Sequence, residues 1–159
     1  MPTSFDNIED LALITIRDYK IDKLYNLSQD NQQPEQFQRY LDGFLLSAIP
    51  NFDRCIQSLE FDLENREFLV DLSLKEQSIL ADLWIIEWFS KETQDAVQIN
   101  NKLQVSSAFT THSAAQNLKE KSVYLDKLKE TLNLKITQYQ LSSLFNLNKS
   151  ASNFFEGLT

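Results

Sequence analysis

Apolar residues recur at intervals of three and four along most of this chain, which is the spacing of amphipathic helices. The clearest run follows Pro34, a residue type that often occupies the first position of a helix. Its members are Phe37, Tyr40, Leu41, Phe44, Leu45, Ala48 and Ile49. The pattern predicts a helix over residues 35–49 that ends or kinks at Pro50, with another turn or two of helix beyond it.

A capping box marks the next helix. Ser73 stands at the N-cap position and Glu76 follows three residues later, so each can bond the backbone N–H of the other. Apolar residues then cover nearly the whole helix circumference over 79–89, as in helices buried at a domain centre or against other subunits. We predict a helix over residues 74–102, either continuous or broken near Ser90.

The last periodic segment is the longest. It follows a second capping box, Ser113 with Gln116, and predicts a helix over residues 114–144 on the order of 45 Å long. A helix of that length could reach past its own small domain, and we expect its seam to bury against a partner protein. The seam consists of Leu118, Ser122, Leu125, Leu128, Leu132, Ile136 and Tyr139. Residues 147–159 are expected to form an extended polar tail.

Two other segments give weaker signals. Residues 8–18 fit a short helix, although Ile14–Ile16 is β-branched and also fits a strand. Residues 60–72 fit either a short hairpin turning at 64–66 or an irregular acidic loop, and the pattern leaves both open. Together the segments predict an all-α helical bundle, with a single domain over residues 1–146 and the tail outside it. The expected shared core consists of Phe44, Leu45, Leu83, Trp84 and Leu125.

Composition favours the same fold class and narrows the function. The 159 residues include two glycines and three prolines, fewer than the turns of a β-sandwich or barrel need. The net charge of −8 argues against a protein that binds duplex DNA or a membrane surface through lysine and arginine. No stretch reaches the roughly 18 apolar residues of a membrane span.

The residues of common catalytic and metal sites are scarce. Cys55 is the single cysteine and His112 the single histidine, so the usual zinc ligands cannot be assembled within the chain. We expect Cys55 to be a small core residue and His112 to lie at a helix start in a capping or surface role. With two glycines there is no phosphate-binding loop. We therefore expect no enzyme activity, no metal and no cofactor.

Three sets of residues are candidates for protein–protein contacts. Acidic residues crowd the 60–72 segment without the spacing of a calcium loop, which favours an acidic rim. Lysines line the long helix, and two adjacent phenylalanines on a polar tail are suited to a neighbour's groove. The candidates are Glu60, Asp62, Glu64 and Glu67 on the rim, Lys119, Lys121 and Lys127 on the helix, and Phe154 and Phe155 on the tail. We expect the rim and the tail to be contact elements rather than fold elements.

Three blocks of the sequence resemble the small helical head–tail connector (adaptor) proteins of tailed bacteriophages. They are YLDGFLLSAIPNFDRC at 40–55, LWIIEW at 83–88 and FTTHSAAQNLKE at 109–120. The order of the blocks, with the acidic linker between the first two, also resembles that family, and the resemblance covers roughly residues 10–142. The resemblance implies an all-α structural protein of the virion neck, made in the bacterial host cytoplasm. Copies would form a ring on the portal protein, commonly of twelve subunits, and contact other neck and tail proteins. DNA would pass without specific binding, and no membrane is involved.

A different class of protein fits the same acidic, helical composition. An intracellular regulator or DNA mimic that inhibits a host protein, such as a nuclease, would also have a low isoelectric point. It would act as a monomer or dimer rather than as a ring. The presence or absence of the chain in virions therefore separates the two classes.

Overall fold

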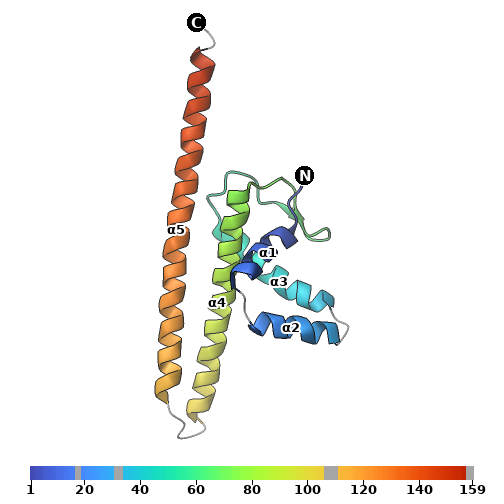
Figure 1. The fold of residues 1–159 in the computed structure, drawn as a ribbon, viewed down its shortest axis with the longest axis vertical. Coiled ribbons are helices and arrows are strands. Elements are labelled where there is room, and N and C mark those ends of the chain that lie inside the picture. Colours follow the sequence, from blue (N-terminus) through green and yellow to red (C-terminus); the bar gives the residue numbers. More distant parts are fainter. Residues whose placement is uncertain (17–18, 31–33, 106–110, 157–159) are drawn as a thin grey trace.

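The computed structural model describes residues 1–16, 19–30, 34–105 and 111–156, and within them the protein is almost entirely helical (Figure 1). This confirms the predicted all-α class. The elements in chain order are α1 (Phe5–Ile16), α2 (Tyr19–Asp30), α3 (Pro34–Ala48), the short 3₁₀ helix η1 (Ile49–Asn51), β1 (Phe61–Asp62), β2 (Glu67–Phe68), α4 (Leu74–Val105) and α5 (Thr111–Glu156).

Helix α4 is the central element of the fold. Helices α1 and α3 pack against it, α2 packs on α3, and α5 runs beside α4 on the side away from α1–α3 (Figure 1). At its C-terminal end, α5 continues well past the rest of the protein. The apolar 79–89 stretch of α4 is therefore covered within the subunit, which explains why it has so little polar surface.

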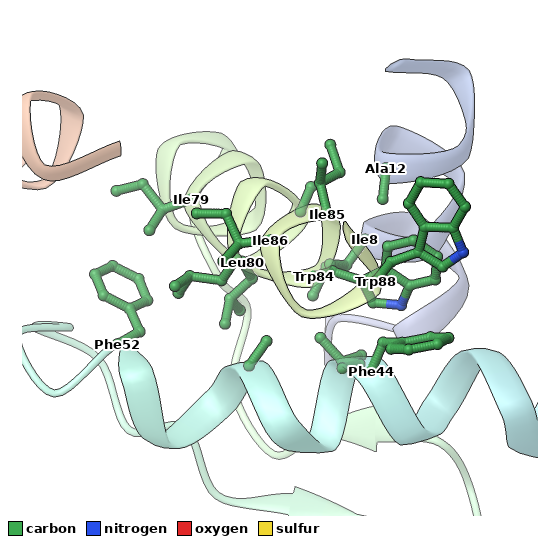
Figure 2. Close-up of a cluster of buried hydrophobic side chains, with 14 of the residues drawn as sticks. Ile8, Ala12, Phe44, Phe52, Ile79, Leu80, Trp84, Ile85, Ile86 and Trp88 are labelled. Carbon is green, nitrogen blue, oxygen red and sulfur yellow. The ribbon is translucent and has the colours of Figure 1, made fainter. Parts of the chain in front are cut away.

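The core is built around Trp84 of α4 (Figure 2). Its ring is fully buried, lies edge-on to Phe44 with 5.1 Å between ring centroids, and its Nε1 donates a 3.1 Å hydrogen bond to the carbonyl of Leu41. Leu45 and Leu83 are buried in the same cluster. The core prediction is thus confirmed for these residues, whereas Leu125 of α5 is only partly buried at the edge of the cluster.

The 60–72 segment forms the hairpin that was one of the two expected alternatives. Strands β1 and β2 pair antiparallel, with Phe61 opposite Phe68, and Arg66 adopts a positive φ of 53° at the turn. Phe68 and Leu72 are buried in the core. Backbone hydrogen bonds join the segment to Thr3, which donates to Val70 and accepts from Phe68. The expectation that this segment is not a fold element is therefore wrong.

Two differences from the expected helices lie in the first half of the chain. Helix α1 begins at Phe5, because Ser4 accepts a hydrogen bond from the N–H of Asp6 and so caps the first turn. The separate helix α2 was not predicted, since its polar composition hides the apolar positions that pack on α3. Residues 52–59 do not continue the helix beyond Pro50, and only η1 follows α3.

The other differences concern the two long helices. Helix α4 passes Ser90 without a break, and α5 begins at Thr111, so Ser113 lies inside the helix rather than at its N-cap. The expected extended tail also differs, because α5 continues through residues 147–156. That segment contains neither proline nor glycine, so nothing in it ends the helix. Residues 157–159 lie outside the described residues.

Candidate assembly interface

Helix α5 is attached to the rest of the protein along one apolar face. Leu132, Ile136 and Tyr139 are buried against the core, and Leu125 and Leu128 pack at its edge. Their spacing of three and four places them in one line along the helix. The predicted seam therefore packs on α4 of the same subunit, and the expectation that it buries against a partner protein is wrong for these residues.

A buried hydrogen-bond junction fixes α5 to the start of α4. The hydroxyl of Tyr139 donates to Oε1 of Glu76 at 2.5 Å and accepts from the N–H of Ile56 at 3.1 Å. The other carboxylate oxygen of Glu76 accepts from the N–H and the hydroxyl of Ser73, so the predicted capping box is present. Burial opposes ionisation of Glu76, but the hydrogen bonds from Tyr139 and Ser73 outweigh it and lower its pKa.

Cys55 belongs to the same junction. Its thiol lies 3.6 Å from Oε1 of Glu76, and its side chain is partly buried. Burial, followed by the negative charge of Glu76, raises the pKa of the thiol to about 11. A thiol with that pKa is protonated at neutral pH, which does not suit a nucleophile.

A second polar contact joins the two long helices one turn away. The ammonium group of Lys135 donates to the hydroxyl of Ser78 at 2.7 Å and pairs with the carboxylate of Asp82. Together with the Glu76–Tyr139 bond, it fixes the rotation of α5 about its own axis. The opposite face of α5 is consequently held toward solvent.

That opposite face carries large apolar side chains. Leu134 and Leu141 are seven residues apart, and each lies two residues from a member of the buried seam, which is about 200° around a helix. Phe145 follows one turn later and Leu144 flanks it. We call these four residues the outer stripe. Their exposed fractions are 66% for Leu134, 51% for Leu141, 57% for Leu144 and 72% for Phe145. Clustered exposure of this kind marks an interaction site.

The predicted contact residues of α5 are placed as follows. Lys119, Lys121 and Lys127 are all exposed, with Lys119 and Lys127 on the side of the outer stripe and Lys121 in line with the buried seam. Glu130 also lies on the outer side, so this face bears both signs of charge. Phe154 and Phe155 fall on the last turns of the α5 backbone, and their side chains lie outside the described ones.

The predicted acidic rim divides into two pairs. Glu60 and Glu64 are exposed to solvent. Asp62 accepts hydrogen bonds from the N–H groups of Glu64 and Asn65 and from the Asn65 side chain, which lower its pKa and brace the turn. Glu67 is half-buried in β2, where its backbone pairs with that of Ser4 in an isolated antiparallel β-bridge.

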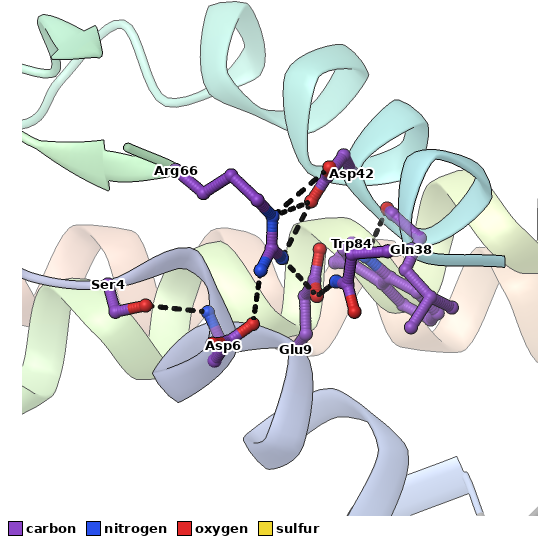
Figure 3. Close-up of polar contacts among 8 residues, drawn as sticks. Ser4, Asp6, Glu9, Gln38, Asp42, Arg66 and Trp84 are labelled. Atoms are coloured by element: carbon purple, nitrogen blue, oxygen red, sulfur yellow. Dashed lines mark hydrogen bonds and ion pairs between the residues drawn. The ribbon is translucent and has the colours of Figure 1, made fainter. Parts of the chain in front are cut away.

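Sequence reasoning missed an ionic cluster around Arg66 (Figure 3). The guanidinium donates to Asp6 at 2.7 Å, to Glu9 at 3.1 Å and to Asp42 at 2.8 Å, and Gln38 donates to Glu9 at 2.7 Å. The cluster joins the hairpin to α1 and α3. Asp42 and Glu9 interrupt the apolar faces of α3 and α1. That interruption was the only sign of the ionic cluster in the sequence.

Glu9 is the most strongly perturbed acid of this cluster. Its Oε1 is buried with no hydrogen-bond partner among the described residues. Burial, followed by the charge of Asp42, raises the pKa of Glu9 to about 8 although Arg66 lowers it. The cluster joins three elements of the fold, and its residues Gln38, Asp42 and Arg66 also line a cleft between α3 and the hairpin.

A cleft of about 530 Å³ lies beside this junction, between α3 and the hairpin. Leu46 and Leu63 provide its apolar wall, and the carboxylates of Glu35 and Glu64 lie at its rim with Arg39. In Figure 1 the hairpin and α3 lie on the opposite side of α4 from α5. The cleft and the outer stripe therefore belong to elements on different sides of α4 (Figure 1).

The described residues show neither a metal-binding group nor a membrane-spanning helix. In the described part of the chain, no three His, Cys, Asp or Glu side chains are grouped to hold a metal ion. None of the described helices combines the length and the hydropathy of a bilayer-spanning segment. Comparison with protein-family models, with curated protein sequences and with solved structures finds no match to this chain.

Proposed function

We propose that this protein is a structural head–tail connector of a tailed bacteriophage, many copies of which form a ring on the portal and link the capsid to the tail. The observation that carries the proposal is the outer stripe of α5. A helix held firmly to its domain on one face presents Leu134, Leu141 and Phe145 on the other, where only a further protein can bury them.

The length of α5 supports the same role. Its 46 residues span on the order of 70 Å, well beyond the body formed by α1–α4 (Figure 1). A solitary binding protein gains nothing from a rod that leaves its own domain. A ring subunit uses such a rod to contact neighbours or the portal, and a closed ring repeats each weak contact many times.

Charge is consistent with a DNA channel. The chain carries 23 acidic and 15 basic side chains, and an acidic wall repels the phosphate backbone instead of holding it. DNA could then slide through the ring without sticking. The order of the three resembling blocks adds independent support, although the apolar 79–89 segment does not, because α4 is covered within its own subunit.

The test is the composition of virions of a phage that encodes this chain. We expect mass spectrometry to detect the protein in purified particles, and cryo-electron microscopy of the neck to place α4 and α5 of each copy in a ring next to the portal. Absence of the chain from mature particles would refute the connector function. Recovery only in a complex with a host nuclease would instead establish the DNA-mimic alternative.

A further inference from the structure

The subunit carries two unpartnered surfaces of matching character on opposite sides of α4. The outer stripe of α5 is convex and apolar. The cleft between α3 and the hairpin is concave, with Leu46 and Leu63 as its apolar residues. Its polar lining consists of three acids, two arginines and a glutamine: Glu35, Asp42, Glu64, Arg39, Arg66 and Gln38. Apolar anchors that enter a neighbour's pocket are the usual source of interface energy.

We infer that the outer stripe of one copy docks into the α3–hairpin cleft of a second copy. The inference rests on the proposed function, since it names the contact that would join neighbouring subunits. Because the two surfaces belong to elements on different sides of α4, each copy uses both of them with different neighbours. Such a head-to-tail contact is heterologous and produces a closed ring or an open chain rather than a symmetric dimer.

The distribution of charge favours this pairing. Residues 111–156 contain six lysines and four acids, a net charge of +2, whereas residues 1–110 contain nine basic and nineteen acidic side chains, a net charge of −10. A contact between α5 of one copy and the body of another therefore brings opposite net charges together, whereas a body-to-body contact brings like charges together. Lys127, seven residues before Leu134 on the outer side of α5, is the candidate to meet Glu64 of the cleft.

The main rival occupant is α5 of a second copy, in a two-helix coiled coil. Stable coiled coils need about three to four consecutive apolar heptads. On this face Lys127 and Glu130 separate Val123 from the stretch between Leu134 and Phe145, so the apolar positions are not continuous over three heptads. A pair of α5 helices would also bring together two segments that each have a net charge of +2, and these would repel each other.

A complementation experiment with the full-length chain distinguishes these contacts. Leu141→Asp places a charge on the outer stripe, and Leu63→Asp places one in the cleft. Both positions are about half-exposed, at 51% and 54%, so both variants should keep the wild-type circular dichroism spectrum. Ile14→Asp, at a 68% exposed position on α1 outside both surfaces, is the matched control.

Sedimentation equilibrium up to millimolar concentration gives the readout. We expect the wild type and Ile14→Asp to associate beyond a dimer, and each of the other variants alone to lose about tenfold or more in association constant. An equimolar mixture of Leu141→Asp and Leu63→Asp should form a one-to-one heterodimer, because one intact stripe and one intact cleft remain.

Three outcomes overturn the inference: a wild type that stays monomeric throughout, a Leu63→Asp variant that associates normally, or a mixture that stays monomeric. The virion test is separate from all three. If the chain is found in the neck but its variants fail to complement, the connector function stands and this contact is refuted. If the variants complement each other but the chain is missing from virions, the contact stands and the connector function is refuted.

Discussion

Tyr139 of α5 donates a 2.5 Å hydrogen bond to Glu76 in the first turn of α4, across 63 residues of sequence. Glu76 simultaneously completes the capping box with Ser73. The start of the central helix and the docking of the long helix therefore depend on one buried carboxylate. If this junction orients the outer stripe, weakening it should affect stability and assembly together.

Tyr139→Phe is the direct test of the junction. The substitution keeps the ring but removes a hydrogen bond to a charged group and leaves the N–H of Ile56 without its acceptor. We expect the free energy of unfolding to fall by about 1.5–3 kcal/mol in urea denaturation. Tyr124→Phe, at a half-exposed position of the same helix, should change it by less than about 0.5 kcal/mol. Equal effects of the two substitutions would show that the junction adds no specific stability.

Trp84→Ala tests the centre of the core. The fully buried indole fills space between α3 and α4 and donates a hydrogen bond to the carbonyl of Leu41, so its removal leaves a cavity and takes away that bond. We expect a loss of roughly 3–5 kcal/mol, measured by thermal or urea unfolding. Leu74→Ala, at an 80% exposed position of the same helix, is the control and should melt like the wild type. A Trp84 variant that melts within a degree or two of the wild type would contradict this placement of the ring.

The helices could be predicted because their signals are local. Apolar periodicity gave α3, α4 and most of α5, and the capping box at Ser73 gave the start of α4 within one residue. What was missed depends on tertiary contacts. Helix α2 carries Ile21, Leu24 and Tyr25 at helical spacing among many polar residues. It packs on α3, where the ring centroids of Tyr25 and Phe37 are 5.6 Å apart.

The candidate interface was predictable only in part. The sequence indicated the apolar seam of the 114–144 segment, but not that α4 of the same subunit would cover it. Leu134 and Leu141 became candidates only when the docking of Tyr139 placed them on the solvent side. The Arg66 cluster was invisible for a related reason, because its acids come from α1 and α3 and meet only in the folded chain.

Glu9 should make stability depend on pH. Its pKa is raised from 4.5 to about 8 in the folded protein, so the folded state binds the proton more tightly than the unfolded state. The resulting stabilisation is complete below about pH 4.5 and is lost as pH rises through 8. Glu76, whose pKa is lowered, acts in the opposite direction and only in acid, so it does not mask the effect between pH 5 and 8.

The measurement is urea denaturation of the wild type and Glu9→Gln at intervals from pH 5 to 9. We expect the free energy of unfolding of the wild type to decrease across this range, and that of Glu9→Gln to decrease less because the amide cannot ionise. Parallel curves for the two proteins would mean that Glu9 titrates at an ordinary pKa.

Truncation after Asn146 tests the role of the end of α5. The last residue of α5 in the described core is Tyr139, and the C-terminal end of the helix projects past the rest of the protein (Figure 1), so the melting temperature should stay within about two degrees of the wild type. Association should weaken, because Phe154 and Phe155 are lost from the part of the helix that projects past the body (Figure 1). The full-length variant with both phenylalanines changed to serine is the matched control, and sedimentation equilibrium should show the same weakening for it. If the shortened protein unfolds, the end of α5 belongs to the fold; if it associates like the wild type, the two phenylalanines are not contact residues.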